Sequence, residues 1–235
     1  MTKHAIILAG GRGTRLRPYT VVLPKPLMPI GEYPILEVII RQLAAAGFDR
    51  ISLAVNHQAE IIKAFFGDGA RWNIRIDYSL EKQPLGTMGP LKLVESMSPY
   101  ALVMNGDILT DLNFAAFHDD HVAGGAVFSV SSARRRNQVD YGVLEIGPSG
   151  QLTGFHEKPT VDYEVSMGVY MVSREVLAHI PEGVTFGFDE LMLKLIGIGE
   201  RVQVRPFDGY WLDIGRPDDY MKAIDEFDAM KARFF

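Results

Sequence analysis

The feature that most constrains this chain is a glycine cluster directly after a short apolar segment near its beginning. Residues His4 to Ala9 are typical of a buried strand, and this segment ends at Gly10. Gly10, Gly11 and Gly13 lie within four positions, where the lack of a Cβ allows a sharp turn and a close approach of backbone N–H groups to a ligand. Successive amides in such a turn form a concave site for phosphate oxygens. The sequence therefore predicts a strand followed by a phosphate-binding loop.

The charge around this loop favours the same interpretation. Residues 1–31 contain no Asp or Glu, and their basic residues are Lys3, Arg12, Arg15, Arg17 and Lys25. The whole chain has 24 Lys and Arg against 29 Asp and Glu, which gives a net charge of −5. A positive loop on an acidic protein indicates a phosphate-rich small molecule, because binding to duplex nucleic acid usually needs an extended basic surface.

Two common phosphate-binding motifs do not fit the loop. The dinucleotide fingerprint requires a third glycine three residues after Gly13, and that position is Leu16. A P-loop requires Gly-Lys-Ser or Gly-Lys-Thr, and neither tripeptide occurs in the chain.

Size and composition predict a single large domain. The 235 residues, 47% of them hydrophobic, can bury a substantial core. We expect one domain over 1–235, with a first half at 1–125 and a second half, which includes the last helix, at 126–235. No apolar run approaches the roughly 20 residues of a membrane span, and the first one is too short for a signal peptide, so a cytoplasmic protein is the default expectation. The absence of cysteine excludes disulfides and thiolate chemistry.

Strand and helix patterns alternate in the first half. The strands are expected at 4–9, 51–55, 74–78 and 101–104, and the helices at 35–46, 59–66 and 87–97. This alternation predicts an α/β fold with a Rossmann-like, mostly parallel sheet flanked by helices. Ligands of such sheets bind beyond the carboxyl ends of the strands, where both the glycine loop and Asp107 are expected.

The second half is richer in strands. We expect them at 126–130, 142–146, 151–155, 166–172 and 201–206, with a hairpin turn at Pro148-Ser149-Gly150 and a helix at 188–196. Arg134-Arg135-Arg136 is interpreted as a solvated turn. A last helix begins at Pro217, and Tyr220, Ile224 and Phe227 form an apolar packing stripe on it.

Two carboxylates are candidates for a magnesium site. Asp107 follows a buried strand, and Asp213 lies in Trp211-Leu212-Asp213-Ile214-Gly215 near the end of the chain. Taken alone, an aspartate after a strand is more often a turn or cap residue. If the two converge over the loop, they suit Mg²⁺, which takes one or two carboxylates together with phosphate oxygens and waters.

The segment from Gly10 to Leu27 resembles the signature of the sugar-1-phosphate nucleotidyltransferases, Gly-Gly-x-Gly-Thr-Arg-Leu-x-Pro followed by Pro-Lys-Pro-Leu. The chain looks like a short form without the C-terminal β-helix domain of longer relatives. The resemblance implies that Arg15, Lys25, Asp107 and Asp213 are catalytic and that Asp107 and Asp213 also bind the metal. It further implies a nucleotide-binding half at 1–125 and a sugar-binding half with the C-terminal helix at 126–235. The nucleotide-binding residues that it implies are Leu8, Gly10, Gly11, Gly13, Thr14, Arg15, Lys25, Glu81, Gly86 and Thr87.

Further segments resemble the sugar side of the same family. Tyr141 and Gly142 match a loop whose glycine N–H contacts the sugar, and Glu157-Lys158-Pro159 matches the Glu-Lys-Pro that holds the sugar phosphate and hydroxyls. Ser166 stands where the family usually has Asn, which leaves the identity of the sugar open.

Glu81 bears on the choice of base. It lies where thymidylyl-transferring relatives tend to have Gln, and an ionised carboxylate only accepts hydrogen bonds. Guanine offers the adjacent N1–H and N2–H donors, so we expect GTP as the nucleotide.

The expected reaction joins an NTP to a sugar 1-phosphate, giving an NDP-sugar and pyrophosphate with Mg²⁺ as cofactor. GTP with a mannose or heptose 1-phosphate is favoured, and glucose 1-phosphate with dTTP or UTP is the alternative. A glycosyltransferase and a non-catalytic nucleotide-sugar-binding regulatory protein are competing hypotheses. Neither nucleic acid nor membrane is an expected partner, and the sequence leaves the oligomeric state open, a homo-oligomer included.

Overall fold

The computed structural model describes residues 2–11, 13–56 and 58–235, so Arg12 of the basic loop lies outside the described residues. Its α-helices are α1 (Ile35–Ala45), α2 (Ala59–Phe66), α3 (Phe114–Gly124), α4 (Phe188–Gly197) and α5 (Pro217–Phe234). The strands are β1 (Lys3–Leu8), β2 (Pro29–Ile30), β3 (Tyr33–Pro34), β4 (Phe48–Val55), β5 (Arg75–Leu80), β6 (Tyr100–Asn105), β7 (Ile108–Thr110), β8 (Phe128–Gln138), β9 (Val143–Ile146), β10 (Leu152–His156), β11 (Thr160–Ser173), β12 (Val202–Phe207) and β13 (Trp211–Asp213). Short 3-10 helices are η1 (Thr14–Leu16), η2 (Tyr19–Val21), η3 (Lys25–Leu27), η4 (Ala70–Trp72), η5 (Gly89–Leu93) and η6 (Arg174–His179).

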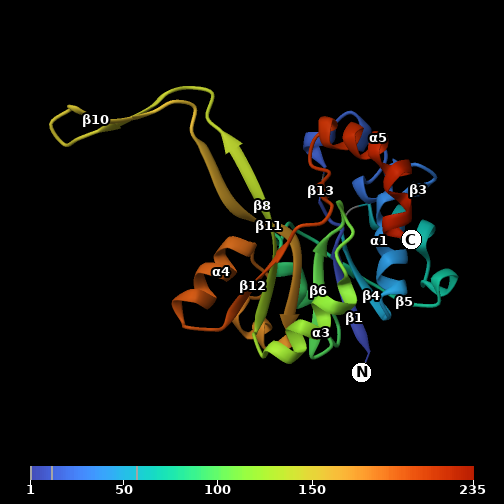
Figure 1. Ribbon diagram of the computed structural model, residues 1–235. Helices are drawn as coiled ribbons and strands as arrows, with labels where there is room; N and C mark the ends of the chain where they lie inside the picture. Colours follow the sequence, from blue (N-terminus) through green and yellow to red (C-terminus); the bar gives the residue numbers. More distant parts are fainter. Residues whose placement is uncertain (1, 12, 57) are drawn as a thin grey trace.

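The predicted mostly parallel sheet is confirmed. Seven strands form it in the order β12-β8-β11-β6-β1-β4-β5, with helices on both faces (Figure 1). Neighbouring strands are parallel except at β11, which is antiparallel to both β6 and β8. Because β1, β4, β5 and β6 are parallel, the segments that follow them meet at one edge of the sheet. None of the described helices has the length and apolar character needed to cross a membrane.

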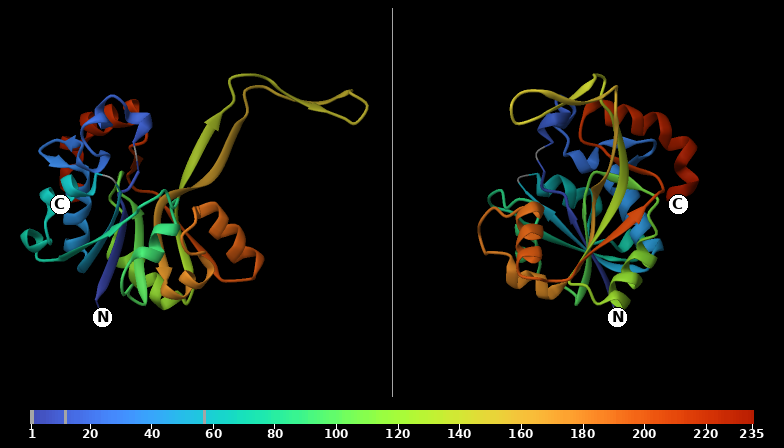
Figure 2. Two further views of the ribbon diagram at one scale, coloured as in Figure 1. Left: turned by 180° about the vertical axis from the view of Figure 1, so that it is seen from behind. Right: turned by 60° about the vertical axis from the view of Figure 1, so that its left-hand side comes forward.

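Residues 134–165, which we call the arm, project from this body. The outer parts of β8 and β11 form a two-stranded ribbon, and the antiparallel hairpin of β9 and β10 lies at its end (Figures 1 and 2). This confirms the hairpin predicted at Pro148-Ser149-Gly150. The interpretation of Arg134-Arg135-Arg136 as a turn is wrong, because these residues lie within β8 and pair with β11.

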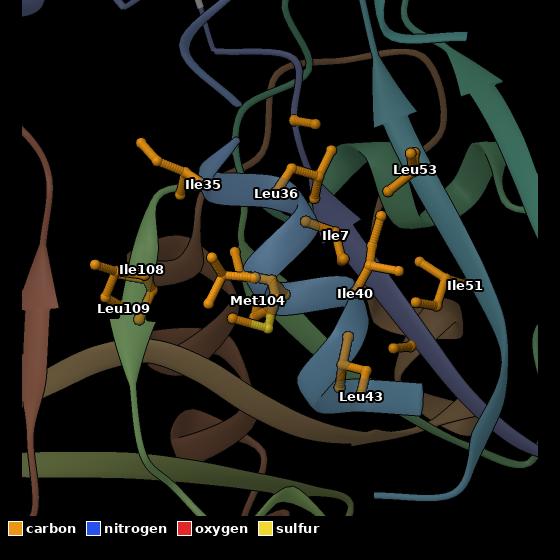
Figure 3. Packing of buried hydrophobic residues seen from close by; sticks show 14 of the residues in the cluster. Ile7, Ile35, Leu36, Ile40, Leu43, Ile51, Leu53, Met104, Ile108 and Leu109 are labelled. Atoms are coloured by element: carbon orange, nitrogen blue, oxygen red, sulfur yellow. The ribbon is translucent and has the colours of Figure 1, made fainter. Parts of the chain in front are cut away.

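The central strands are buried on both faces, which explains their unbroken apolar sequences. In β1, Ala5 and Ile7 belong to the core on the α1 side, whereas Ile6 belongs to the core on the α4 side. Figure 3 shows the first of these cores, where Ile40 and Leu43 of α1 lie over the strands. This packing holds the α1 side of the sheet together and leaves its carboxyl edge free for a site.

The prediction of a helix over 87–97 is wrong. The structure has only the short η5 there. The amides of Met88 and Gly89 donate to the carbonyl oxygen of Phe186 at 3.0 and 3.1 Å, and Ser96 has a φ of 51°, so no regular helix continues through the segment. On α5, Tyr220 and Phe227 are buried as expected, but Ile224 is 39% exposed and lies outside the packing stripe.

Candidate active site

A cavity of about 460 Å³ opens where β1, β4 and β6 end. Six of the predicted nucleotide-binding residues line it: Leu8, Gly10, Gly11, Glu81, Gly86 and Thr87. The remaining lining residues are Asn56, Lys82, Gln83, Pro84, Leu85, Pro90, Asn105 and Asp107. The glycine loop, the segment after β5 and the end of β6 therefore enclose one space.

Gly10 and Glu81 are in close contact within this cavity. A Cβ at position 10 would lie 2.5 Å from Glu81 Oε1, so a larger residue there would displace the Glu81 carboxylate. The other carboxylate oxygen of Glu81 accepts a hydrogen bond from the Leu85 amide at 3.3 Å. Burial raises the pKa of the Glu81 carboxyl, and the hydrogen bond from Leu85 lowers it to a smaller extent. Glu81 is thus held as an acceptor against the glycine loop.

Gly86 and Thr87 connect the cavity to α4. Gly86 has a φ of +77°, and a Cβ there would lie 2.6 Å from the Phe186 carbonyl oxygen. The Thr87 hydroxyl accepts a hydrogen bond from the Phe188 amide at the start of α4, at 2.8 Å. The pair forms a tight turn, whereas the sequence predicted the beginning of a helix.

Gly13, Thr14 and Arg15 do not line the cavity. Gly13 has a φ of +59°, and its carbonyl oxygen accepts a hydrogen bond from the Thr20 hydroxyl at 2.7 Å. Thr14 and Arg15 begin η1 and are exposed. A Cβ at Gly215 would lie 3.5 Å from the Arg15 guanidinium, which places Arg15 beside the segment that carries Asp213.

The two predicted metal ligands are brought together. Antiparallel pairing of β13 with β7 sets Asp213 opposite Ile108, and the Ile214 amide donates to the Asp107 carbonyl oxygen at 3.1 Å. Desolvation and the charge of Asp107 raise the pKa of the Asp213 carboxyl, while Lys25 and Arg15 act to lower it. Two carboxylates and two cations from distant parts of the sequence thus interact at one place.

Lys25 is buried and forms an ion pair with Asp107 Oδ2. The other oxygen, Asp107 Oδ1, is buried without a hydrogen-bond partner among the described residues. An unpartnered carboxylate oxygen next to a second carboxylate suits a hard cation such as Mg²⁺. No cluster of three or more His, Cys, Asp or Glu side chains with metal-binding geometry occurs in the described part of the chain, so the residues fit a two-carboxylate site completed by phosphate oxygens and waters.

The residues expected to bind the sugar do not lie beside the cluster of Lys25, Asp107 and Asp213. Tyr141, Gly142, Glu157 and Lys158 lie on the arm, are exposed, and do not line the cavity. Ser166, at the base of the arm, donates its hydroxyl to Tyr170 Oη at 3.1 Å. Asp213 contributes to raising the pKa of Tyr170, after burial, so Ser166 lies near the acidic pair. The roles expected for the four arm residues remain predictions.

Sequence reasoning missed Asn56 and Asn105. Asn56 follows β4, and its side-chain amide donates to the Gly10 carbonyl oxygen. Asn105 ends β6 and lies against Gly168, where a Cβ would come within 2.7 Å of Nδ2. A polar side chain directly after a buried parallel strand is the signal that could have identified both.

Comparison with known proteins gives a consistent result. The model of the family described as nucleotidyl transferase matches residues 4–229. A UTP–glucose-1-phosphate uridylyltransferase of Synechocystis sp. is 34% identical, over 94% of this chain and 62% of the relative. A mannose-1-phosphate guanyltransferase of Aspergillus fumigatus is 35% identical, over 92% of this chain and 62% of the relative. The chain thus spans just over three-fifths of the length of these curated relatives.

Among solved structures, HddC from Yersinia pseudotuberculosis, complexed with GMP-PN, superimposes with a TM-score of 0.73. It is 26% identical, and the match covers 96% of this chain and all of HddC.

Proposed function

The chain belongs to the nucleotidyl transferase family, and on this premise we propose that it transfers a nucleoside monophosphate from an NTP to a sugar 1-phosphate, releasing pyrophosphate. The observation that carries the proposal is the convergence of Arg15, Lys25, Asp107 and Asp213 beside a cavity lined by the glycine loop. Such a mixed cluster suits a reaction between two polyanions, because cations offset their repulsion and carboxylates can hold a metal.

GTP and a mannose or heptose 1-phosphate are the proposed substrates. Glu81 supports guanine, because its carboxylate lines the cavity and can accept hydrogen bonds from N1–H and N2–H. The guanyltransferase relative and the HddC complex with GMP-PN support the same base. Glucose 1-phosphate with UTP or dTTP is the second candidate, and the Synechocystis relative is the observation in its favour.

The proposed nucleophile is a phosphate oxygen of the sugar 1-phosphate, which attacks the α-phosphorus in line while the bond to the pyrophosphate oxygen breaks. A phosphate monoester has a second pKa near 6, so it is largely dianionic at pH 7 and needs no general base. The chain's task is then to position the two anions and stabilise their charge. Amides of the glycine loop and Arg15 hold the triphosphate, and Lys25 stabilises charge near the α-phosphate.

Asp107 and Asp213 would hold a Mg²⁺ ion, and Lys158 of the arm would bind the sugar phosphate. When bound, the ion supplies positive charge that offsets the repulsion between the two substrates. Cytoplasmic location and the division into a nucleotide half and a sugar half belong to the same proposal.

The test is pyrophosphate release with Mg²⁺ while GTP, dTTP, UTP, CTP and ATP are crossed with mannose, glucose and heptose 1-phosphates. Release that requires both substrates is expected, and the best pair identifies them. Lys25→Ala should lower turnover by roughly 10²–10³, by analogy with the loss of a charge-stabilising donor, whereas Lys92→Ala, at an exposed position outside the cavity, should not.

Silence across the grid while NDP-sugars still bind would overturn the proposal in favour of a regulatory protein. Release of nucleoside diphosphate in place of pyrophosphate would favour a glycosyltransferase.

A further inference from the structure

A segment in the second half of the chain holds one wall of the cavity. The wall consists of residues 83–87, and the segment that holds it is 183–188, which leads into α4 and which we call the pre-α4 segment. The hydrogen bonds that join the two are those from Gln83 Nε2 to the Gly183 carbonyl oxygen at 2.7 Å, from the Thr185 hydroxyl to the Pro84 carbonyl oxygen at 2.8 Å, from the Phe186 amide to the Leu85 carbonyl oxygen at 2.9 Å, and from the Phe188 amide to the Thr87 hydroxyl at 2.8 Å. The wall is therefore held by residues about a hundred positions away in the sequence.

The Pro84–Leu85 peptide group connects Thr185 to Glu81. Its carbonyl oxygen accepts the hydrogen bond from the Thr185 hydroxyl, and its N–H donates to Glu81 Oε2 at 3.3 Å. The C=O and N–H belong to one planar trans group and point in opposite directions, so the bond to the oxygen also fixes the direction of the N–H. The Thr185 hydroxyl thus restrains the Glu81 carboxylate through a single peptide group.

Thr185 acts on this wall from outside the cavity. In the described part of the chain, none of residues 183–188 lines the cavity, and Thr185 is exposed. Leu85, by contrast, is buried, so the peptide group lies between an accessible hydroxyl and the cavity. A substitution at Thr185 can therefore remove the restraint without removing any atom that lines the cavity.

We propose that Thr185 is a positioning residue for base recognition, which acts on Glu81 through the Pro84–Leu85 peptide group. The inference rests on the proposed function, because it takes Glu81 as the acceptor of the guanine N1–H and N2–H donors. Two adjacent donors need the carboxylate at the right distance and angle for both bonds at once, whereas thymine offers a single N–H. Loss of the restraint therefore weakens the binding of guanine more than that of thymine, and a residue of the half expected to bind the sugar contributes to the choice of base.

Thr185→Val tests the restraint, because it keeps the shape of the side chain and removes the hydroxyl. The ratio of kcat/KM for GTP to that for dTTP should fall about two- to tenfold, the effect of one neutral hydrogen bond. The change should lie in KM for GTP, with kcat nearly unchanged. Thr185→Ser keeps the hydroxyl and should keep the wild-type ratio. Thr153→Val is the matched control, since the Thr153 hydroxyl also donates to a backbone carbonyl oxygen, at 3.1 Å, from a position that does not line the cavity.

A double variant shows whether Thr185 acts through Glu81. In the Glu81→Gln background, Thr185→Val should leave the ratio at the value of Glu81→Gln alone, because both substitutions affect one contact. A wild-type ratio in Thr185→Val, an equally large fall in Thr185→Ser or Thr153→Val, or additive effects in the double variant would each overturn the inference.

Calorimetric titration with GTP and with dTTP separates this inference from the proposed function. A wild-type chain that releases no pyrophosphate with any substrate pair overturns the proposed function, and the ratio of the two dissociation constants then replaces the ratio of kcat/KM. In Thr185→Val that ratio should shift toward dTTP by the same factor. Equal ratios in the wild type and Thr185→Val, or a wild type that binds GTP no more tightly than dTTP, would overturn the inference even if the chain transfers another nucleotide.

Discussion

At the scale of single residues, Glu81 decides the base in the proposed reaction. Its carboxylate accepts from the Leu85 amide and lies against Gly10, so a guanine edge would meet a fixed acceptor. Glu81→Gln replaces one acceptor by a donor and should lower the ratio of kcat/KM for GTP to that for dTTP by roughly 10- to 100-fold, the worth of a charged hydrogen bond. Glu95→Gln, an exposed position outside the cavity, is the control. An unchanged ratio would contradict the role of Glu81.

Two buried histidines make stability depend on pH. His4 bonds to Ser52 and His121 to Ser129, and burial lowers the pKa of each from 6.5 to about 4. Because the native state resists protonation, their contribution is fully present above pH 6.5 and is lost as pH falls toward 4. Each histidine should add a slope of at most about 1.4 kcal/mol per pH unit to the free energy of unfolding.

Urea unfolding between pH 7.5 and 4.5 measures this slope. His121→Gln should remove about half of the histidine contribution, whereas His156→Gln, on the exposed arm, should leave it unchanged. Equal slopes for the wild type and His121→Gln would show that His121 titrates normally.

At the scale of elements, the sequence correctly predicted the strands that a local run of apolar residues determines. The buried strands β1, β4 and β6 have continuous apolar runs, and Asp107 was expected at the carboxyl edge because it follows one of them. The pairing of Asp213 with Asp107 was expected only from the family resemblance. The segment 87–97 could not be predicted, because its backbone donors are satisfied by Phe186, about a hundred residues away. The projection of the arm from the body could not be predicted either. Alternation of apolar and polar residues predicts a strand but does not show whether the strand packs against the rest of the molecule.

The start of α3, which was also not predicted, depends on one side chain. Asn113 Oδ1 accepts a hydrogen bond from the Ala116 amide at 2.9 Å and caps the helix. Asn113→Ala should lower the free energy of unfolding by about 1 kcal/mol, measured by urea denaturation. Asp120→Ala, at an exposed position in the same helix, should change it by less than about 0.5 kcal/mol. Equal effects of the two substitutions would show that the cap contributes nothing.

At the scale of the whole molecule, the last helix packs against the segment that follows the basic loop at the beginning of the chain. Tyr220 Oη donates to the Pro29 carbonyl oxygen at 2.7 Å, and Phe227 packs over Gly31. The segment from Pro29 to Gly31 is thereby held by α5, the helix that follows Asp213 in the chain. Asp213, the cationic loop and the C-terminal helix lie close together, so damage to the helix contact should affect both stability and turnover in the proposed reaction.

Gly31 provides a direct probe of this unit. Its φ is +54°, and a Cβ would lie 2.8 Å from the Phe227 ring, whereas Gly47, with a φ of +83°, has no atom within 4 Å of its Cβ position. Gly47→Ala should therefore cost only backbone strain, about 1 kcal/mol. Gly31→Ala should cost the same strain plus about 1–3 kcal/mol for overpacking. The difference between the two unfolding free energies measures the contact with Phe227.

A double-mutant cycle shows whether the extra cost comes from that ring. Phe227→Ala alone should destabilise by about 3–5 kcal/mol, because it empties a buried site. In that background the Cβ of Gly31→Ala has room, so the second substitution should cost only the roughly 1 kcal/mol seen at Gly47. If the losses in unfolding free energy caused by Gly31→Ala and Phe227→Ala were additive, the extra cost at Gly31 would not come from the Phe227 ring. Lower turnover of Gly31→Ala but not of Gly47→Ala, in the pyrophosphate assay, would then connect the helix contact to the position of Arg15 and Lys25.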